Sequence, residues 1–437
     1  MTTTKNNEHK KLNFSSEREQ SQACLNSAEH EKNQGRKVLN VPNKREQNHT
    51  CSDSSEREGL RPEGNVPNLR FPEFQGEWKE ERLADIADLY KGTGISKDQL
   101  SDDGEPCILY GELYTKYKSE TIREVISKTN IDNTKLVRSK ANDVIIPCSG
   151  ETAEDIATAR CVLNGNILLG GDLNIIRLHG YDGAFMSYQL NGRRKYDIAK
   201  VAQGVSVVHL YGEHLKGVKT FNPCLEEQKK IAGLLALLDE RIATQNKIID
   251  KLQSLIKGIA QHCIRELING WEYVRLGDIC KITTGKLDAN AQVENGQYPF
   301  FTCAERPFNI DSYAFDTEAL LISGNGANLG YINYYKGKFN AYQRTYVLDH
   351  FSVNIQYVKW ALKVLLPQRI AIEKSSSNTP YIVLSTLADL KIPIPNNSKQ
   401  NHIADLMMSF ERKLSTQLVL SDLYNKQKQY LLRQMFI

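Results

Sequence analysis

The chain repeats itself, and this repeat limits its possible folds more than any other feature. Residues Trp78–Ile86 read WKEERLADI and residues Trp271–Ile279 read WEYVRLGDI, so Trp, Arg, Leu, Asp and Ile return 193 positions later. Gly92 and Gly285 follow with the same offset. Because self-similarity at a fixed offset indicates copies of one structural unit, the sequence predicts two related domains.

A second pair of matching phrases ends each unit. Residues 215–232 read LKGVKTFNPCLEEQKKIA, and residues 387–404 read LADLKIPIPNNSKQNHIA. Their Leu, Lys, Pro, Gln, Ile and Ala match at an offset of 172. Since the opening phrases are 193 apart and the closing phrases 172, the first unit is 21 residues longer, and the extra length lies in its middle.

Each unit combines predicted strands with short helices. Aliphatic, β-branched or aromatic runs, which favour strands, occur at residues 143–146, 174–178, 318–321 and 345–348. Helices are expected at residues 185–190 and 355–366. The sequence therefore predicts that each unit is an α+β domain.

A long amphipathic helix follows each unit. Residues that alternate four and three positions apart form a coiled-coil seam after the first unit: Ile231, Leu235, Leu238, Ile242, Gln245, Ile249, Leu252, Ile256, Ile259 and Cys263. The register returns 172 positions later: Ile403, Met407, Phe410, Leu414, Gln417, Ser421, Tyr424, Lys428, Leu431 and Met435. Both seams carry a glutamine at the same position, and a buried polar residue in such a seam fixes the register.

Connectivity predicts how these helices run. Residues 225–268 would form a helix of roughly 65 Å at ~1.5 Å per residue, and only two residues separate it from Trp271. The second unit must then begin at the far end of the first helix, and the second helix runs back if the two pair. The predicted fold class is α+β, with two pseudo-repeated domains separated by two long antiparallel coiled-coil helices. The alternative is two unrelated amphipathic helices, each packed on its own domain.

Composition sets further limits. Residues 1–65 are dense in Ser, Asn, Glu, Lys and Gln, and we expect a disordered extension because such a segment buries little apolar surface. The nine cysteines form no C-x-x-C pair and the nine histidines no ligand spacing, so neither zinc nor disulfides are expected. No apolar stretch has the length of a membrane helix, which favours a soluble, cytoplasmic protein. With a net charge of only +4, a DNA-binding surface would need local clusters of Lys and Arg.

Two domains on a rod of this length suit a double helix. B-DNA turns every ~34 Å, and two-module readers bind half-sites a fixed number of turns apart. Two diverged domains in one chain would read two different half-sites, which gives an asymmetric, split target. A structural scaffold that bridges two protein partners is the alternative, because scaffolds also use helical rods.

With these features the chain resembles the specificity subunits of type I restriction–modification systems over about residues 66–437. The resemblance rests on the phrase NVPNLRFPEF at residues 65–74 that leads to Trp78, and on the repeated opening at Trp271. It also rests on the Pro-x-x-x-x-Gln motifs that end the two units and on the helices that follow them.

This resemblance implies that the chain works in a complex in which other subunits have the catalytic roles. Residues 66–224 and 271–395 would be target recognition domains, and residues 225–270 and 396–437 would be spacer helices. The helices would dock two adenine methyltransferase subunits, which use S-adenosylmethionine, and restriction subunits would add cleavage that depends on ATP and magnesium. This chain would bind double-stranded DNA but no membrane and no cofactor, and it would not be an enzyme. The recognition subunit of a related fused nuclease–methylase system is a further alternative.

Basic and amide side chains are the candidates for DNA contact, because Arg and Lys bind phosphates while Arg, Lys, Asn and Gln read base edges. In the first domain the candidates are Lys116, Lys118, Arg193, Arg194, Lys195, Gln203 and Ser206. In the second domain they are Arg306, Asn325, Asn328, Lys336, Lys338, Arg344, Lys374 and Asn378. We expect Arg194→Ala or Arg344→Ala to weaken DNA binding without unfolding the chain.

Signals for catalysis are weak. The chain has no G-x-x-x-x-G-K-[ST] phosphate loop, and the glycines of residues 323–330 lack the G-x-G-x-x-G spacing. We expect those glycines to form a turn or a loop that approaches DNA. Residues 378–381 read NTPY, which is similar to the N-P-P-Y motif of amino-methyltransferases, but Thr replaces the first Pro and no glycine-rich cofactor motif precedes it. No methyltransferase activity is expected.

Overall fold

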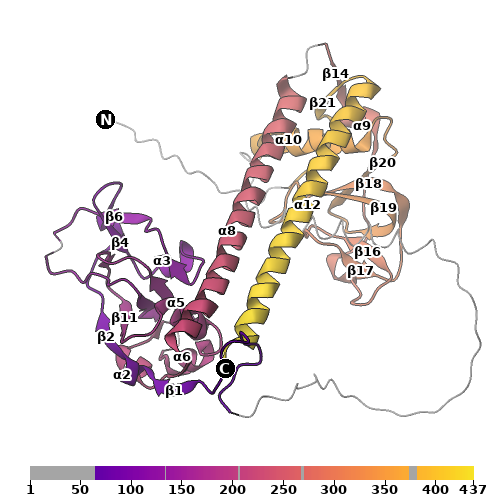
Figure 1. Ribbon diagram of the computed structural model, residues 1–437. Helices are drawn as coiled ribbons and strands as arrows, with labels where there is room; N and C mark the ends of the chain where they lie inside the picture. Colours follow the sequence, from indigo (N-terminus) through magenta and orange to yellow (C-terminus); the bar gives the residue numbers. More distant parts are fainter. Residues whose placement is uncertain (1–63, 133, 205–206, 267–269, 374–380) are drawn as a thin grey trace, which may run out of the picture. The chain divides into compact units, whose positions relative to one another are not determined.

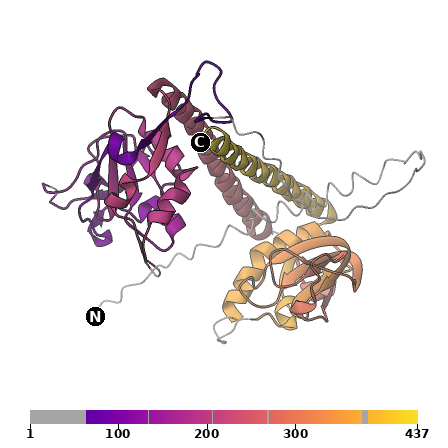
Figure 2. The same cartoon turned by 90° about the horizontal axis from the view of Figure 1, so that it is seen from below.

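The computed structural model describes residues 64–132, 134–204, 207–266, 270–373 and 381–437. The chain divides into two compact units (Figures 1 and 2). Among the described residues, one unit contains the first domain and the chain as far as Thr244, together with Asp422–Ile437, and the other contains Gln245–Ser421. Each unit therefore holds one domain and a part of both long helices.

A five-stranded sheet with the order β2-β11-β7-β9-β5 forms the centre of the first domain. Its strands are Ala87–Lys91, Leu173–Leu178, Asp143–Pro147, Arg160–Val162 and Thr121–Ile122. Strand β7 is buried along its whole length. Its Val144 and Ile146 pack into one apolar cluster and Ile145 into another, because both faces of the sheet are covered.

Smaller sheets and short helices complete the first domain. Strand β1 (Lys79–Arg82) pairs with β13 (Lys219–Asn222), and β8 (Ser149–Gly150) pairs with β12 (Val208–His209). A four-stranded sheet has the order β10-β4-β6-β3, with strands Leu168–Leu169, Glu105–Ile108, Ser127–Thr129 and Leu100–Ser101. The helices are α2 (Leu83–Ile86), η1 (Lys97–Gln99), α3 (Glu112–Thr115), α4 (Ala153–Ile156), α5 (Gly183–Asn191), α6 (Lys195–Val201) and α7 (Gly212–Lys216).

The second domain has a six-stranded sheet with the order β15-β20-β18-β19-β16-β17. Its strands are Lys281–Thr284, Thr345–Asp349, Phe315–Ser323, Ile332–Ala341, Tyr298–Phe301 and Phe308–Ile310. Strand β14 (Glu272–Arg275) pairs with β21 (Lys391–Ile394). The helices are α9 (Leu276–Ile279), η3 (Ala289–Ala291), α10 (Ile355–Glu373) and α11 (Leu384–Ala388).

The two domains share a topology, which confirms the predicted duplication. The order β2-β11-β7 in the first domain corresponds to β15-β20-β18 in the second, and the pair β1–β13 corresponds to β14–β21. The predicted strands and helices lie within these elements. In the first domain β4 pairs in parallel with β10, as β16 pairs with the end of β19 in the second domain, so the four-stranded sheet has a counterpart there. The extra residues of the first domain lie between β4 and β10.

A buried glutamine joins each domain to the long helix that follows it. The Gln228 amide donates to Pro223 O (2.8 Å), and its oxygen accepts from Asp182 N (2.9 Å) at the start of α5. Gln400 does the same with Pro395 O (2.8 Å) and Asn354 N (3.0 Å), immediately before α10. The bonds match because all three positions of each set keep the offset of 172.

The two long helices are α8 (Leu225–Gln261), which continues into one wide turn η2 (His262–Glu266), and α12 (Asn397–Gln434). In one unit the start of α8 packs with the end of α12, through Ile231, Leu235 and Met435. In the other unit, later residues of α8 pack with the first half of α12, including Ile256 and Met407. The segments in each unit therefore run antiparallel and lie side by side (Figures 1 and 2).

Every predicted seam position lies buried or half-buried in its unit. Leu235, Ile249 and Met407 have no exposed surface, whereas Ile242, Phe410, Gln417, Tyr424 and Leu431 are half-buried. Gln245 Nε2 donates to Gln417 Oε1 (2.9 Å) and to Gln417 O (3.0 Å). Since these two residues are repeat equivalents and meet each other, the local twofold relation between the helices passes between them.

Candidate nucleic-acid interface

Three segments of the first domain meet beyond the end of β7. Cys148 N donates to Asp172 O (2.7 Å), and Leu210 N donates to Cys148 O (2.9 Å). The side chain of Asn174 completes the arrangement by donating to Leu210 O (2.9 Å). We call this set of three hydrogen bonds, with the residues that it joins, the clamp of the first domain.

The second domain contains the same clamp beyond the end of β18. Gly324 N donates to Arg344 O (2.8 Å), and Ile382 N donates to Gly324 O (2.8 Å). Tyr346 OH donates to Ile382 O (2.8 Å). Arg344, Tyr346 and Ile382 lie 172 positions after their counterparts in the first domain, so the framework is repeated although most of its side chains differ.

Next to each clamp, two backbone segments form a short antiparallel pairing. In the first domain β8 pairs with β12, so that Ser149 lies opposite His209. In the second domain Asn325 pairs with Tyr381. His209 and Tyr381 are absent from the predicted DNA-contact residues, which were chosen for positive charge and amide groups. The offset of 172 between them is the signal that could have found them.

Several candidates of the second domain gather at its clamp. Asn325 and Arg344 belong to it, and the Arg344 side chain is exposed. Asn328 Nδ2 donates to Cys303 O (3.1 Å), and Cys303 Sγ donates to Arg344 O (3.5 Å), so the loop after β16 joins the same edge. Arg306 is exposed three positions farther along this loop.

Lys336 and Lys338 lie away from this edge, on β19. Lys336 Nζ lies 3.8 Å from Glu318 on the neighbouring strand β18. Lys338 Nζ lies 4.6 Å from the centre of the Tyr313 ring, and its pKa is raised chiefly by the Tyr313 hydroxyl. Both ammonium groups therefore already have partners on the outer face of the sheet.

In the first domain, Lys116 forms an ion pair with Glu112 (2.7 Å) and donates to Ser127 Oγ (2.7 Å). Lys118 Nζ donates to the backbone oxygen of Tyr114 (2.9 Å), whose hydroxyl donates to Ser149 O (3.0 Å) at the clamp. Gln203 is exposed and pairs through its backbone with His209. Lys118 and Gln203 therefore lie near the clamp, through Tyr114 and His209.

The basic run before α6 holds the end of α12. Arg193 donates to Arg433 O (2.5 Å), and Arg194 donates to Ile437 O (3.0 Å) while it stacks over Phe221 at 5.2 Å. Arg194 also pairs with Asp197 (3.1 Å). Because these guanidinium groups have structural partners, we leave both out of the interface that we propose below.

Lys195 is half-buried at the first position of α6. The candidates Ser206, Lys374 and Asn378 lie outside the described residues.

An ion cluster fastens the first domain to both helices of its unit. Lys428 of α12 pairs with Asp239 of α8 (2.6 Å) and with Glu120 of the domain (2.5 Å). Asp239 also accepts from Tyr188 OH (2.7 Å) and Ser119 Oγ (2.9 Å). Burial raises the pKa of Glu120, and the charge of Lys428 opposes this rise only in part.

The unit of the second domain has an acidic residue at the position equivalent to Asp239, but the lysines that pair with it lie on a different element. Glu411 of α12 lies 172 positions after Asp239 and pairs with Lys359 (2.7 Å) and Lys363 (3.3 Å), both on α10 of its own domain. Burial acts to raise the pKa of Glu411, but Lys363 and Lys359 outweigh it, and the pKa is lowered. Both domains are thus bound to their helices through charge, with different lysines.

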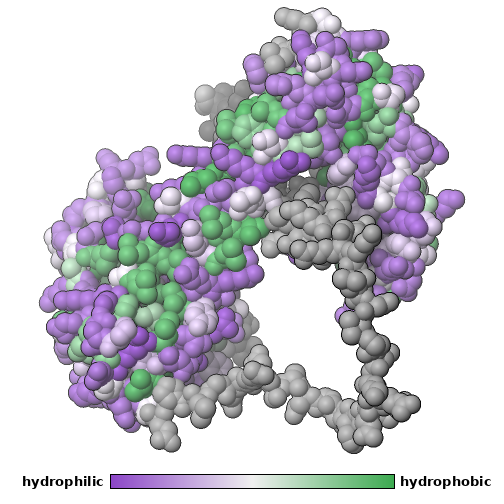
Figure 3. Space-filling model, turned by 45° about the vertical axis from the view of Figure 1, so that its right-hand side comes forward, coloured by the Kyte–Doolittle hydropathy of each residue, from purple (hydrophilic) through white to green (hydrophobic). Residues whose placement is uncertain are grey.

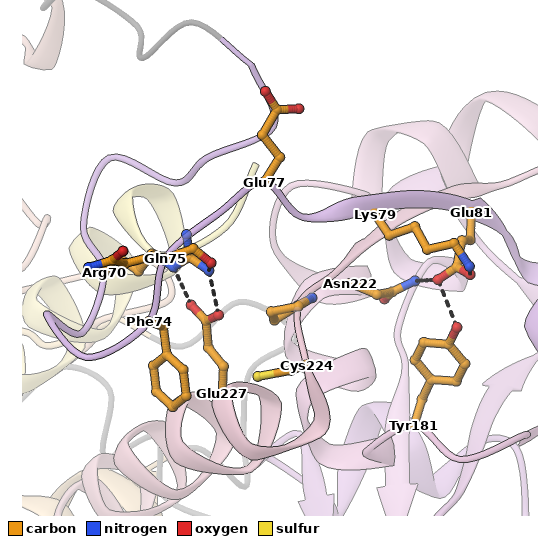
Figure 4. A pocket seen from close by; sticks show the side chains of 11 residues that line it. Arg70, Phe74, Gln75, Glu77, Lys79, Glu81, Tyr181, Asn222, Cys224 and Glu227 are labelled. Carbon is orange, nitrogen blue, oxygen red and sulfur yellow. Dashed lines mark hydrogen bonds and ion pairs between the residues drawn. The ribbon is translucent and has the colours of Figure 1, made fainter.

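A hollow of about 390 Å³ lies in the unit of the first domain, at the base of α8 (Figure 4). Its charged groups bind one another: Arg70 forms two bonds with Glu227 (2.7 and 2.8 Å), and Glu81 accepts from Tyr181 (2.7 Å). The Arg70–Glu227 pair ties the segment before β1 to the first turn of α8, and the Tyr181–Glu81 bond ties β1 to the segment before α5. We therefore assign the hollow no ligand.

Over the part of the chain that the structure describes, no cluster of three or more His, Cys, Asp or Glu side chains could hold a metal ion. Among the same residues, none of the helices combines the length and apolar character needed to cross a membrane.

The geometry defines a class of protein: two α+β domains from one duplication, each with the same clamp, and each followed by a long helix that packs antiparallel to the other. The sequence profile described as the type I restriction modification DNA specificity domain matches residues 75–254 and 268–419. The chain therefore belongs to this family, which confirms the resemblance found in the sequence.

Curated relatives carry the same description. The type I restriction enzyme EcoDI specificity subunit of Escherichia coli is 44% identical over 135 residues, which span 31% of this chain and 30% of that protein. The MjaVIII specificity subunit of Methanocaldococcus jannaschii is 23% identical over 393 residues, or 78% of this chain and 87% of that protein. The match to the MjaIX subunit of the same organism spans 61% of that protein.

A solved structure shares the fold. The S subunit of a type I restriction-modification system from M. genitalium superposes with a TM-score of 0.63 at 18% sequence identity. The superposition covers 85% of this chain and 99% of that one. At this identity the likeness supports the fold of the chain.

Proposed function

We propose that this chain is the DNA sequence-specificity subunit of a type I restriction–modification enzyme and reads a bipartite, asymmetric target. The observation that supports this proposal is that one framework occurs twice, with the same clamp in both domains, while the side chains on it differ. Two copies of one reader with different side chains recognise two different half-sites. Membership of the DNA specificity family supports the same conclusion.

We infer that α8 offers a docking surface to the methyltransferase subunits. Four large apolar side chains of this helix are exposed: Leu234, Leu237, Ile248 and Leu255. Leu234 and Leu237 lie one turn apart in the unit of the first domain, and Ile248 and Leu255 share one heptad position in the other unit, so each unit has a short apolar stripe on α8. Such an apolar stripe suits an amphipathic helix of a partner. Figure 3 shows a molecular face on which hydrophilic and apolar patches alternate.

The chemistry of the complex would belong to its other subunits. We assign S-adenosylmethionine to the methyltransferase subunits, and ATP and magnesium to the restriction subunits, because this sequence carries no phosphate loop and no complete methyltransferase motif. The role of this chain would be to place the methyltransferase on its target, so it would be no enzyme by itself.

Adenine-methylation mapping tests the proposal. The genome of the host is mapped with this gene intact, deleted and restored. We expect methylation at one split motif to disappear on deletion and to return on complementation. A motif that persists without the gene contradicts the proposal.

A binding titration separates DNA recognition from protein scaffolding. Binding of the complex to duplexes with the motif should weaken steeply with salt, because each neutralised phosphate releases counterions. A complex that assembles with the methyltransferase but binds no duplex at any salt concentration would favour the scaffold.

A further inference from the structure

We propose that each clamp carries the side chains that read base edges, one set for each half-site. In the first domain these are Ser149, Asp172 and His209, and in the second domain they are Asn325, Arg344 and Tyr381. This inference rests on the proposed function and names the residues that determine its specificity.

The first argument is that the framework is constant while the presented side chains change. The bond of Leu210 N to Cys148 O (2.9 Å) corresponds to that of Ile382 N to Gly324 O (2.8 Å). The backbone oxygen of the same residue is held in both domains, by Asn174 in one and by Tyr346 in the other. A duplicated reader with two targets needs this combination, because its geometry is kept while its chemistry diverges.

Rigidity is the second argument. The clamp lies at the end of β7 or β18, and its segments are fixed by the hydrogen bonds of the framework. In the second domain a Cβ atom on Gly324 would lie 2.5 Å from Arg344 O, so these two segments approach closely there, whereas Cys148 occupies the equivalent position of the first domain. Recognition side chains discriminate best when the backbone below them is fixed on strands.

The third argument is the chemistry of the three positions. Arg344 is exposed, and Tyr381, which pairs with Asn325 on the other side of that segment, is 54% exposed. An arginine donates two bonds to guanine O6 and N7, whereas a carboxylate accepts from cytosine N4. The equivalent of Arg344 in the first domain is Asp172, whose side chain is 48% exposed and lies 3.9 Å from the exposed Lys91 ammonium group. This reversal of charge means that the two domains cannot prefer the same base at this position.

The remaining two positions add different donors and acceptors. Asn325 has the amide that pairs with adenine N6 and N7, whereas Ser149 at the equivalent position has a hydroxyl that binds several bases. At the third position the first domain has the imidazole of His209, and the second domain has the phenol of Tyr381. All three positions thus differ in hydrogen-bonding pattern between the domains, as two half-sites of different sequence require.

The test uses the full-length chain produced with the methyltransferase subunit of its own system, in a host without that system. The methylated motif is mapped for wild type, for Arg344→Ala and Tyr381→Ala, and for Asp172→Ala and His209→Ala. We expect the first pair to relax one half-site and the second pair to relax the other. Discrimination at the affected base should fall about tenfold or more.

Matched controls keep the result specific. Tyr273→Ala removes a tyrosine of the second domain that is 52% exposed on β14. His179→Ala removes an exposed imidazole of the first domain that pairs with Asp88 (3.1 Å). Both should leave the motif unchanged. Thermal melting identifies any unfolded variant, and Tyr381→Phe and Asp172→Asn then replace the alanine variants.

The outcomes separate this inference from the proposed function. If wild type gives no sequence-specific methylation, the proposed function itself fails. If wild type gives a split motif but the clamp variants keep it unchanged, the inference is wrong. Clamp variants that weaken methylation at all sites equally, without relaxing either half-site, also overturn the assignment, because that pattern belongs to phosphate contacts.

Discussion

At the residue scale, single buried polar side chains set how the domains meet the helices. Gln228 and Gln400 are both 2% exposed, and each bridges the end of its domain to the start of a domain helix. Each glutamine binds a backbone N–H and a backbone oxygen. The loss of either bond leaves a buried polar group unsatisfied, and this costs more than the bond itself contributes.

Replacement of Gln400 by Leu should lower the free energy of unfolding of its unit by about 2 to 4 kcal/mol. The change removes the partners of Asn354 N and Pro395 O. Gln253 is the matched control in the same unit, since it is 7% exposed and its Nε2 has no hydrogen-bond partner among the described residues. Gln253→Leu should be neutral or stabilising. Urea unfolding followed by the fluorescence of Trp271 and Trp360 measures both.

Replacement of Lys428 by Met should destabilise the unit of the first domain by about 3 kcal/mol at neutral pH. The change leaves Glu120 and Asp239 close together without their cation. A carboxyl whose folded-state pKa lies above its unfolded value stabilises the fold when it is protonated. The pKa of Glu120 is already raised and rises further without the lysine. The deficit should therefore shrink as the pH falls from 8 to 5.

Lys426→Met is the control, because Lys426 forms an exposed pair with Asp422 on the same helix. It should change stability by less than about 0.5 kcal/mol at either pH. A Lys428→Met deficit that is the same at both pH values would mean that Lys428 does not neutralise Glu120.

At the element scale, the two equivalent glutamines form one of the polar contacts of the helix pair, beside those of Ser421 with Asn246 and of Lys428 with Asp239. Most of the other seam side chains of α8 and α12 are apolar, so most of the contact is not directional. The Gln245–Gln417 bond is directional and forms in one register only. We infer that this contact, rather than the apolar seam, selects the register of the two helices.

A double-mutant cycle on this pair tests its coupling. Gln245→Leu and Gln417→Leu alone should each lower the stability of the unit by about 1 to 2 kcal/mol, because the remaining amide loses its partner. The double variant should cost less than the sum of the single changes, by about 1 kcal/mol. Urea midpoints of the four proteins give the coupling energy, and additive effects would show that the two glutamines act independently.

At the scale of the whole molecule, the exposed stripes of α8 connect this chain to its proposed partner. Leu237 is 62% exposed and Leu255 is 51% exposed. Replacement of both by Asp should leave the unfolding midpoint nearly unchanged, because neither side chain is in a core. The affinity for the methyltransferase subunit should fall at least about tenfold.

Ile126→Asp supplies the comparison for this prediction, since Ile126 is 60% exposed on the first domain. It should leave assembly intact. Isothermal titration with the purified methyltransferase subunit distinguishes the variants. Equal affinities for wild type and the double Asp variant would assign the docking surface elsewhere.

Several features of this protein can be predicted from the amino-acid sequence alone. The duplication, the α+β character of each domain and both long helices follow from repeated phrases and from local periodicity, which depend on neighbours a few residues apart. The structure places helices at Leu225–Gln261 and Asn397–Gln434 where the seams predict them. The placement of Gln245 opposite Gln417 follows from the shared register together with the antiparallel connection.

Other features, such as the partners of polar side chains, depend on contacts between residues that are far apart in the sequence. The basic run at Arg193 and Arg194 indicated DNA, but the fold brings these residues to Arg433 and Ile437, some 240 positions away. The clamp unites Cys148, Asp172 and Leu210, none of which stands out by residue type. A local pattern reports which face of an element is apolar, but the partner of a polar group depends on which segments the fold makes neighbours. For this reason the sequence determined the elements, and the tertiary structure decided the site.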